Sequence, residues 1–218
     1  MKKHIICLGD SNTHGYCADP NDNADRTNRF NEDERWPMVL QKALGNEYLI
    51  LEEGLSGRTT VFDDPIHEGL NALSCIYSIL MSHEVVDLLI IMLGTNDTKE
   101  RFSANARIIS LGLDRLIKKA KAIDCWGSKE PKILVVCPPP IRDDFQDVLA
   151  EEYMGLDCVQ KSKELSKFYS KIAQQNNCLF FDAKDCEFNS LDCMHLTKKG
   201  HGQLASYLNP IVKKAFEA

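Results

Sequence analysis

Short apolar runs, bounded by glycine, aspartate or proline, recur along the chain. They lie at residues 5–8, 48–51, 87–93, 133–137 and 179–181. Several are rich in β-branched residues, and their apolar positions are continuous rather than alternating. Runs of this kind predict strands that are buried on both faces.

Segments with helical spacing lie between these runs, at residues 36–44, 70–82, 104–122 and 158–175. In residues 104–122, apolar residues from Ile108 to Ile117 recur at intervals of three and four, and lysines gather near the end, which favours a helix. Residues 198–216 are also helical in character, but Pro210 predicts a break or a new first turn. The alternation of strands and helices predicts an α/β fold with a parallel sheet between two helix layers.

Two stretches are less regular than the rest. Residues 19–34 are rich in Asp, Asn and Arg, and residues 138–157 open with three prolines. We expect both to be loops shaped for function. In open parallel sheets a ligand sits outside the carboxyl ends of the strands, so the chemistry should be sought in the loops that follow them.

Length and composition indicate an ordinary globular enzyme-sized protein. The chain has 218 residues, 44% hydrophobic and 27% charged, so we expect one domain over residues 1–218. A net charge of -6 argues against a nucleic-acid partner. The first residues show no signal-peptide core, and no run approaches the roughly 20 apolar residues of a membrane helix. We therefore expect a cytoplasmic protein without a membrane partner.

Nine cysteines without a Cys-x-x-Cys pair suit neither a disulfide framework nor a thiolate zinc site. Cys186, Cys193 and His195 could share a metal, but zinc ligands usually come in closely spaced pairs. We therefore expect reduced thiols and no metal.

The first candidate for chemistry is Ser11, which follows the first predicted strand in Gly9-Asp10-Ser11-Asn12. A serine between a strand and a helix is exposed at the sheet edge, and backbone N–H groups at the helix start can stabilise negative charge. Ser11 could equally be only the helix N-cap, because serine is favoured there.

An acid–base pair stands near the end of the chain, where Asp192 precedes His195 by three residues. On a turn the two side chains can touch, and the carboxylate would then fix the imidazole tautomer and stabilise the imidazolium form. A helix cap or a surface ion pair explains the same spacing.

The loops after the second and third strands offer hydrogen-bond donors. Gly57 could direct its backbone N–H, and Asn96 its amide, toward Ser11, whose own N–H would complete an oxyanion hole. Each residue could instead only form a turn. Glycine adopts the positive φ that some turns require, and the asparagine side chain can hydrogen-bond to the nearby backbone.

Together these motifs resemble a known family. Gly9-Asp10-Ser11, Gly57, Gly94-x-Asn96-Asp97 and Asp192-x-x-His195 are similar, in order, to the four blocks of the SGNH hydrolases, also called the GDSL esterase/lipase family. The resemblance spans almost the whole chain. It is closest to the bacterial arylesterase/acyltransferase branch, through residues 52–60, 63–65 and 90–99 and Trp36.

The resemblance implies a three-layer α/β/α sandwich with a flavodoxin-like, five-stranded parallel sheet. It implies a serine esterase for small carboxylic esters, short acyl or aryl, with Ser11 as nucleophile, His195 as base and Asp192 as the orienting acid. Ser11, Gly57 and Asn96 would form the oxyanion hole. It further implies acyl transfer to alcohols in some members, no metal or cofactor, a small-molecule ester as partner, and a homo-oligomer.

The chain departs from the family at two positions. Asn12 replaces the common leucine, and Gly57 replaces the alanine of the arylesterase branch while matching the wider family. We expect Asp10 and Asn12, which flank the nucleophile, to support it or to line the pocket.

Other residues near these motifs have supporting interpretations. We expect Arg58 and Asp97 to hold the loops through an ion pair or hydrogen bonds, and Trp36 to lie in the core or the pocket wall. His14 would line the pocket, and His201 would lie on the surface.

Two other functions remain open from the sequence. The polar loop at residues 19–34 suits a carbohydrate acetyl esterase. A non-catalytic binding module could also keep the same fold.

Overall fold

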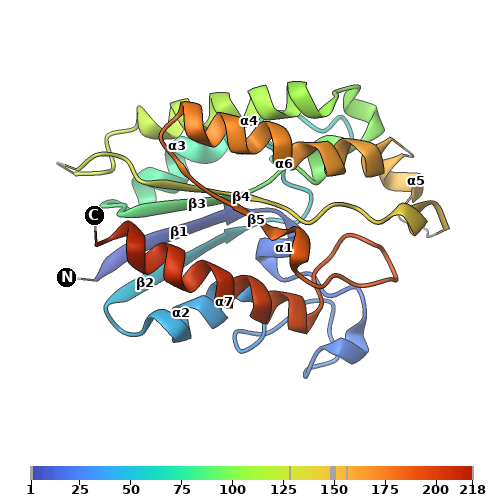
Figure 1. Ribbon diagram of the computed structural model, residues 1–218, viewed down its shortest axis with the longest axis horizontal. Helices are drawn as coiled ribbons and strands as arrows, with labels where there is room; N and C mark the ends of the chain where they lie inside the picture. The colour runs from blue at the N-terminus through green and yellow to red at the C-terminus, as the bar shows by residue number, and fades with distance from the viewer. Residues whose placement is uncertain (1, 128, 148–150, 156, 218) are drawn as a thin grey trace.

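The computed structural model describes residues 2–127, 129–147, 151–155 and 157–217. Its centre is a sheet of five parallel strands in the order β2-β1-β3-β4-β5 (Figure 1). The strands are β1 (Lys3–Gly9), β2 (Tyr48–Gly54), β3 (Leu88–Met92), β4 (Ile133–Cys137) and β5 (Leu179–Asp182). Each predicted apolar run forms one strand.

Helices cover both faces of the sheet. Figure 1 shows α3, α4 and α6 on one side, and α2 and α7 on the other. The long helices are α2 (Trp36–Leu44), α3 (Ala72–Ser82), α4 (Ala106–Lys121), α6 (Cys158–Gln175) and α7 (Lys198–Ala215), and the short ones are α1 (Ser11–His14) and α5 (Glu151–Met154). This arrangement confirms the predicted three-layer α/β/α sandwich.

The two irregular stretches contain short 3-10 turns. Residues 19–34 include η1 (Pro20–Asp22), and residues 138–157 include η4 (Asp143–Asp147) beside α5. Residues 148–150 and 156 of the second stretch lie outside the described residues. Three further turns follow β3 and β5, namely η2 (Asn96–Thr98), η3 (Glu100–Phe102) and η5 (Ala183–Asp185).

The strands are continuously apolar because their side chains feed two separate cores. In β1, Ile5 and Cys7 pack with α2 and α7, whereas Ile6 and Leu8 pack with α3, α4 and α6. All four side chains are fully buried. Successive side chains of a strand point to opposite faces, so a strand between two helix layers has no polar face to show.

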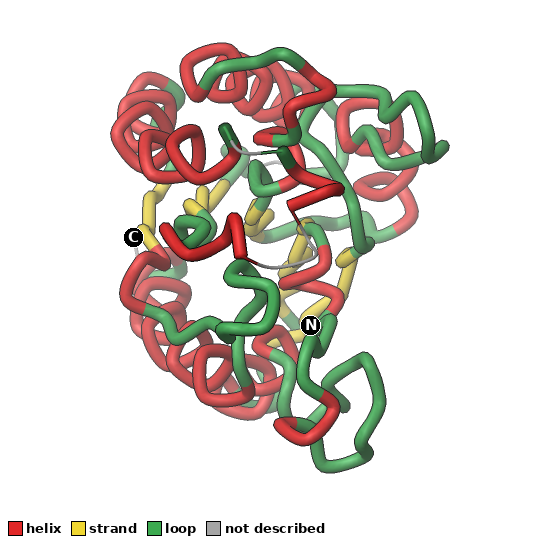
Figure 2. Tube along the Cα trace, turned by 90° about the vertical axis from the view of Figure 1, so that its right-hand side faces the viewer, coloured by secondary structure: helices red, strands yellow, loops and turns green. Residues whose placement is uncertain are grey.

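The strand order reverses at the carboxyl end of β1. This strand pairs with β2 on one edge and β3 on the other, so the chain turns in opposite directions after β1 and after β2. Figure 2 shows loops gathered in front of the strands, between the two helix layers. A reversal of this kind is where ligands bind in open α/β sheets.

Helix α7 runs through Pro210 without interruption, so the predicted break is wrong. The proline lies on the exposed side, where water can bind the carbonyl group left without an N–H partner. Leu204, Leu208 and Val212 meanwhile stay buried on the opposite side. Among the described residues, no helix is long and apolar enough to cross a membrane.

Only one side of the apolar stretch in α4 is buried. Ile109, Leu113 and Leu116 lie in the core, whereas Ile108 and Leu111 are about half exposed. The spacing predicted the helix correctly, but the predicted apolar face included residues of the exposed side, Ile108 and Leu111, as well as buried ones.

His201 is fully buried, contrary to the surface position expected for it. Its Nδ1 accepts a hydrogen bond from the Trp36 backbone N–H at 3.2 Å. Trp36 begins α2, where N–H groups lack partners within the helix, and Arg35 gives no side-chain cap. The edge of the imidazole also meets the ring of Phe30, with centroids 4.9 Å apart. The histidine therefore caps one helix from within another.

Burial lowers the pKa of His201 to about 3, with a smaller contribution from the charges of His195 and Arg35. The neutral ring keeps Nδ1 free to accept, and a proton there would face the Trp36 N–H. The unfolded chain takes up this proton below pH 6.5, whereas the folded chain resists it until about pH 3. Stability is therefore lost as the pH falls through this window.

We expect His201→Asn to flatten this loss, because the amide oxygen can replace Nδ1 and does not titrate. Between pH 6.5 and pH 4.5 the parent chain should lose about 2.5 kcal/mol of unfolding free energy relative to the variant. Urea denaturation of both proteins at each pH measures the difference, and groups common to both cancel. Parallel pH profiles would contradict the buried, neutral state of His201.

Candidate active site

Ser11 opens helix α1 directly after β1, an inner strand of the sheet. The cap of this helix is Asp10, whose carboxylate accepts the Asn12 N–H at 3.0 Å. Gly15 ends the helix with a φ of 87°, in the left-handed region that favours glycine. Because Asp10 fills the capping position, capping does not account for the serine.

The Ser11 hydroxyl contacts the acid–base pair. His195 Nε2 lies 2.7 Å from Ser11 Oγ, and His195 Nδ1 lies 2.7 Å from Asp192 Oδ2. The other carboxylate oxygen of Asp192 accepts the backbone N–H groups of Met194 and His195, each at 3.1 Å. The cap of α7 is Thr197, so Asp192 is free of that role. The structure thus brings the three residues together in one line of contacts.

The environment keeps Asp192 ionised. Burial acts to raise its pKa, but the hydrogen bond and charge of the His195 side chain, together with the backbone N–H groups of His195 and Met194, lower it below the ordinary value. The side chains of Asp192 and His195 are 16% and 14% exposed, so the pair is shielded from water without being sealed. A carboxylate in this state can hold the imidazole and stabilise its protonated form.

Tyr16 is a site residue that sequence reasoning missed. Its ring lies against the His195 imidazole, with centroids 4.6 Å apart and planes tilted by 55°. Its backbone N–H donates to the Ser11 carbonyl at 2.9 Å. Its place directly after Gly15, which ends α1, is the only sequence signal, and that signal alone does not mark a site residue.

The loop after β2 attaches to the end of β1. The Gly9 carbonyl accepts the Leu55 N–H at 3.1 Å and the Arg58 guanidinium at 3.2 Å, and the same guanidinium donates to the Glu53 carbonyl. Gly57, within this loop, has a φ of 86°. A Cβ on Gly57 would meet a Leu70 methyl group at 3.0 Å. Arg58 thus holds the loop that carries Gly57 against the strand that carries Ser11.

The loop after β3 attaches in turn to the loop after β2. Asn96, 8% exposed, donates its side-chain amide to the Arg58 carbonyl at 3.2 Å. Asp97 is fully buried and accepts the Thr60 N–H at 2.9 Å and the Thr60 hydroxyl. Arg58 and Asp97 therefore join the loops by hydrogen bonds, and among the described residues they form no ion pair with each other.

Burial changes the charges beneath the site. It raises the pKa of Asp10 and of Asp97 to about 6, against opposing hydrogen bonds to their carboxylates. It also lowers the pKa of Arg58. One oxygen of Asp10 is buried without a hydrogen-bond partner in the described part of the chain. Asp10 adjoins Ser11 in the chain, and Arg58 and Asp97 join the neighbouring loops by hydrogen bonds.

The remaining predicted residues lie around this cluster. Asn12 is 1% exposed and bonds to the backbone beside His195. Trp36 is fully buried in the core with α7. His14 is partly exposed at the end of α1, and burial and nearby arginines lower its pKa.

The segment after β4 supports the acid–base loop. The Arg142 backbone N–H donates to the Cys193 carbonyl at 3.2 Å. Cys193 is buried with Ile141 and Phe145, and its φ is 62°, a value uncommon outside glycine. Residues 141–145 therefore pack against the turn between Asp192 and His195 and support it.

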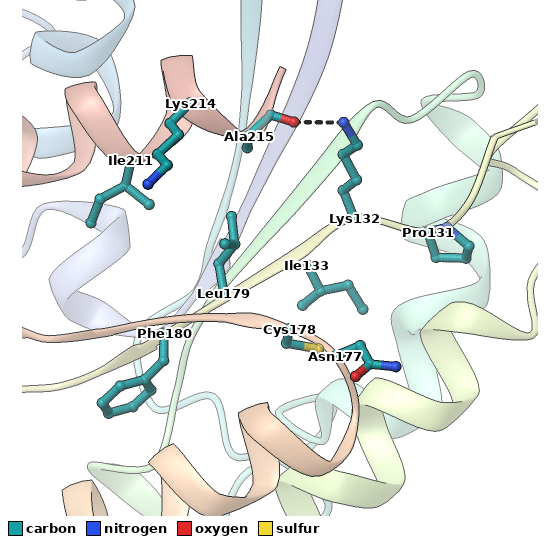
Figure 3. Close-up of a pocket in the computed structure, with 10 residues that line it drawn as sticks. All are labelled: Pro131, Lys132, Ile133, Asn177, Cys178, Leu179, Phe180, Ile211, Lys214 and Ala215. Atoms are coloured by element: carbon teal, nitrogen blue, oxygen red, sulfur yellow. Dashed lines mark hydrogen bonds between the residues drawn. The ribbon is translucent and has the colours of Figure 1, made fainter. Parts of the chain in front are cut away.

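A cavity elsewhere in the molecule contains none of the candidate residues. Its volume is about 550 Å³, and its apolar walls come from the start of β4, the start of β5 and the end of α7 (Figure 3). Lys132 Nζ donates to the Ala215 carbonyl at its rim. The cavity thus lies by the amino ends of β4 and β5, whereas Ser11 follows the carboxyl end of β1.

Residues 7–203 match the model of the GDSL-like lipase/acylhydrolase family. The chain belongs to this family. The match covers every candidate motif of the GDSL-like chain, and it confirms the resemblance found in its sequence.

Solved structures similar to this GDSL-like chain include three esterases. An aryl esterase from M. smegmatis is 36% identical, with 98% of this chain and 99% of that chain covered and a TM-score of 0.84. A carbohydrate acetylesterase family member from Sinorhizobium meliloti is 31% identical, with 99% and 100% covered and a TM-score of 0.89. A carbohydrate acetylesterase from the same organism is 34% identical, with 98% and 99% covered and a TM-score of 0.84.

A comparison with curated proteins gave no match. The family and the structural neighbours together support a carboxylic ester hydrolase. In the described ranges, no group of three or more His, Cys, Asp or Glu side chains is arranged to hold a metal ion.

We expect Gly54→Ala to disturb the site from below. Gly54 ends β2, and a Cβ there would lie 2.7 Å from the His14 Cα and closer still to the His14 nitrogen. Because backbone cannot yield as a side chain can, α1 must shift. Unfolding free energy should fall by about 2–3 kcal/mol, measured by urea denaturation.

Gly202→Ala is the matched control for this substitution. A Cβ at Gly202, inside α7, meets nothing within 4 Å, so the change should be neutral or stabilise by up to about 1 kcal/mol. Equal stabilities of the two variants would contradict the close contact between β2 and α1.

Proposed function

We propose that this protein is a serine esterase that cleaves small carboxylic esters through Ser11, His195 and Asp192. The observation that carries the proposal is the position of the imidazole, 2.7 Å from the hydroxyl on one side and 2.7 Å from the carboxylate on the other. A hydroxyl is a weak nucleophile unless a base takes its proton, and the base must be held in the correct tautomer.

In the first step Ser11 Oγ attacks the ester carbonyl carbon while its proton passes to His195 Nε2. The carbonyl oxygen becomes an oxyanion. His195 then gives the proton to the leaving alcohol or phenol oxygen as the carbon–oxygen bond breaks, which leaves an acyl group on Ser11. Water repeats the sequence and releases the carboxylic acid and the free serine.

The oxyanion would be bound by the N–H groups of Ser11 and Gly57 and by the Asn96 amide. Within the described residues, the N–H groups of Ser11 and Gly57 donate to no protein acceptor. Asn96 uses one of its two amide protons on the Arg58 carbonyl, which leaves the other free. Loss of one such donor typically costs about 10² to 10³ in rate.

Two finer points belong to the same proposal. The aryl esterase and the carbohydrate acetylesterases are about equally similar to this chain, so small acyl groups on aryl, alkyl or sugar alcohols are the substrate class we propose. An alcohol that replaces water in the second step would accept the acyl group, so the same residues would also support acyl transfer.

We expect Ser11→Ala to abolish cleavage of short-chain p-nitrophenyl esters, because no other group takes the place of the nucleophile. The measurement is the absorbance of released p-nitrophenolate at roughly 400 nm, which should rise with the parent protein and not with the variant. The thermal unfolding profile of the variant should match that of the parent. Retained hydrolysis would show that Ser11 is not the nucleophile. An inactive parent protein would favour a binding module instead.

Acetylated sugars assayed beside aryl and alkyl acetates separate the two substrate classes. The polar segment 19–34 leads us to expect that acetylated sugars are cleaved as well as simple acetates. Release of acetate from each substrate measures this. Reaction with aryl acetates alone would contradict the carbohydrate part of the proposal.

A further inference from the structure

Asn12, the residue after the nucleophile, joins two parts of the chain that lie far apart in sequence. Its Oδ1 accepts the Leu196 N–H at 2.9 Å, and its Nδ2 donates to the Met194 carbonyl at 3.3 Å. These two backbone groups stand on either side of His195. The side chain is 1% exposed, so water does not compete for the bonds.

The loop around His195 is shaped by its own hydrogen bonds. Asp192 accepts the N–H groups of Met194 and His195, and Asn189 donates to the His195 carbonyl through its backbone at 2.9 Å and its side chain at 2.8 Å. These bonds fix the pairing of Asp192 with His195. They do not fix the distance from that pair to Ser11.

The attachment of this loop to the nucleophile depends on Asn12. Among the hydrogen bonds of the described residues, three join residues 10–16 to residues 187–197. One is the contact between Ser11 and His195 itself. The other two are those of the Asn12 side chain. A leucine, which the common family motif has at this position, could form neither.

We propose that Asn12 is a positioning residue that holds His195 within reach of the Ser11 hydroxyl. This inference rests on the proposed esterase function. An amide is suited to the task because it presents one acceptor and one donor side by side, which match an N–H and a C=O two residues apart. A base displaced by about 1 Å can cost about 10² in rate, so the effect should fall on the chemical step.

The test compares Asn12→Leu with the parent protein on a p-nitrophenyl ester. Leucine has a similar size and removes both bonds. We expect kcat to fall about 10²-fold with KM changed less than about threefold, because the substrate pocket stays formed while the base moves. A kcat within about threefold of the parent value would overturn the proposal.

A crystal structure of Asn12→Leu shows whether placement or folding has changed. We expect the Asp192–His195 contact to remain and the His195–Ser11 separation to exceed hydrogen-bond distance. Loss of the Asp192–His195 contact would mean that Asn12 shapes the loop itself. An unchanged His195–Ser11 contact would mean that Asn12 does not place His195. Both results would overturn the proposal.

Asn12→Asp is the second variant, in case the leucine variant does not fold. It keeps the shape and the acceptor for the Leu196 N–H, but it replaces the donor to the Met194 carbonyl with a carboxylate oxygen. We expect kcat to fall at least about tenfold, because the bond to the Met194 carbonyl is lost and two acceptor oxygens then face each other in a buried place. A parent-like kcat would count against positioning.

Asn176→Leu is the matched control. Asn176 also bonds through its amide, to Asp114 at 2.7 Å and to the Ile172 carbonyl at 2.9 Å, but it lies at the far end of α6. It should lower stability and leave kcat unchanged. Ser11→Ala distinguishes failure of the esterase mechanism from failure of the role of Asn12. Activity in that variant would refute the mechanism, whereas the crystal structure of Asn12→Leu still measures how Asn12 places His195.

Discussion

The contact between Ser11 Oγ and His195 Nε2 joins residues 184 positions apart in the chain. It requires the end of the inner strand β1 and the loop before the last helix to meet at the same point. The burial of both sheet faces makes this possible, because it forces every loop with polar side chains to the ends of the strands. The strand order also reverses beside β1, and open α/β sheets bind their ligands at such a reversal.

The loops that meet beside the end of β1 are held by buried polar side chains. Arg58 and Asp97 bind the loops after β2 and β3, and Asn12 binds the loop that carries His195. Groups of this kind are costly to bury, and the raised pKa of Asp10 and Asp97 reflects that cost. They remain because a hydrogen bond with a defined direction fixes a loop more closely than apolar contact does, and the chemistry depends on that placement.

Much of the fold could be predicted from the sequence, because buried strands and amphipathic helices leave clear patterns. The residues of the candidate site were named through the resemblance of four motifs to the SGNH blocks. Ser11, Gly57, Asn96 and His195 each lie beside a predicted element, but each alone also fitted a cap or a turn. Side chains whose partners are distant could not be placed. His201 looked like a surface residue, but it caps α2 across the core, and Tyr16 gave no sign of its contact with His195. Pro210 was tolerated because its side of α7 faces water.

We propose that three loops converge on Ser11 and make it the activated nucleophile. Inactivation with a fluorophosphonate, followed by mass spectrometry of the digested protein, tests it most directly. We expect one covalent adduct per chain, on the peptide that contains Ser11, formed as ester hydrolysis is lost. An adduct on another residue, or hydrolysis that continues with Ser11 fully modified, would contradict it.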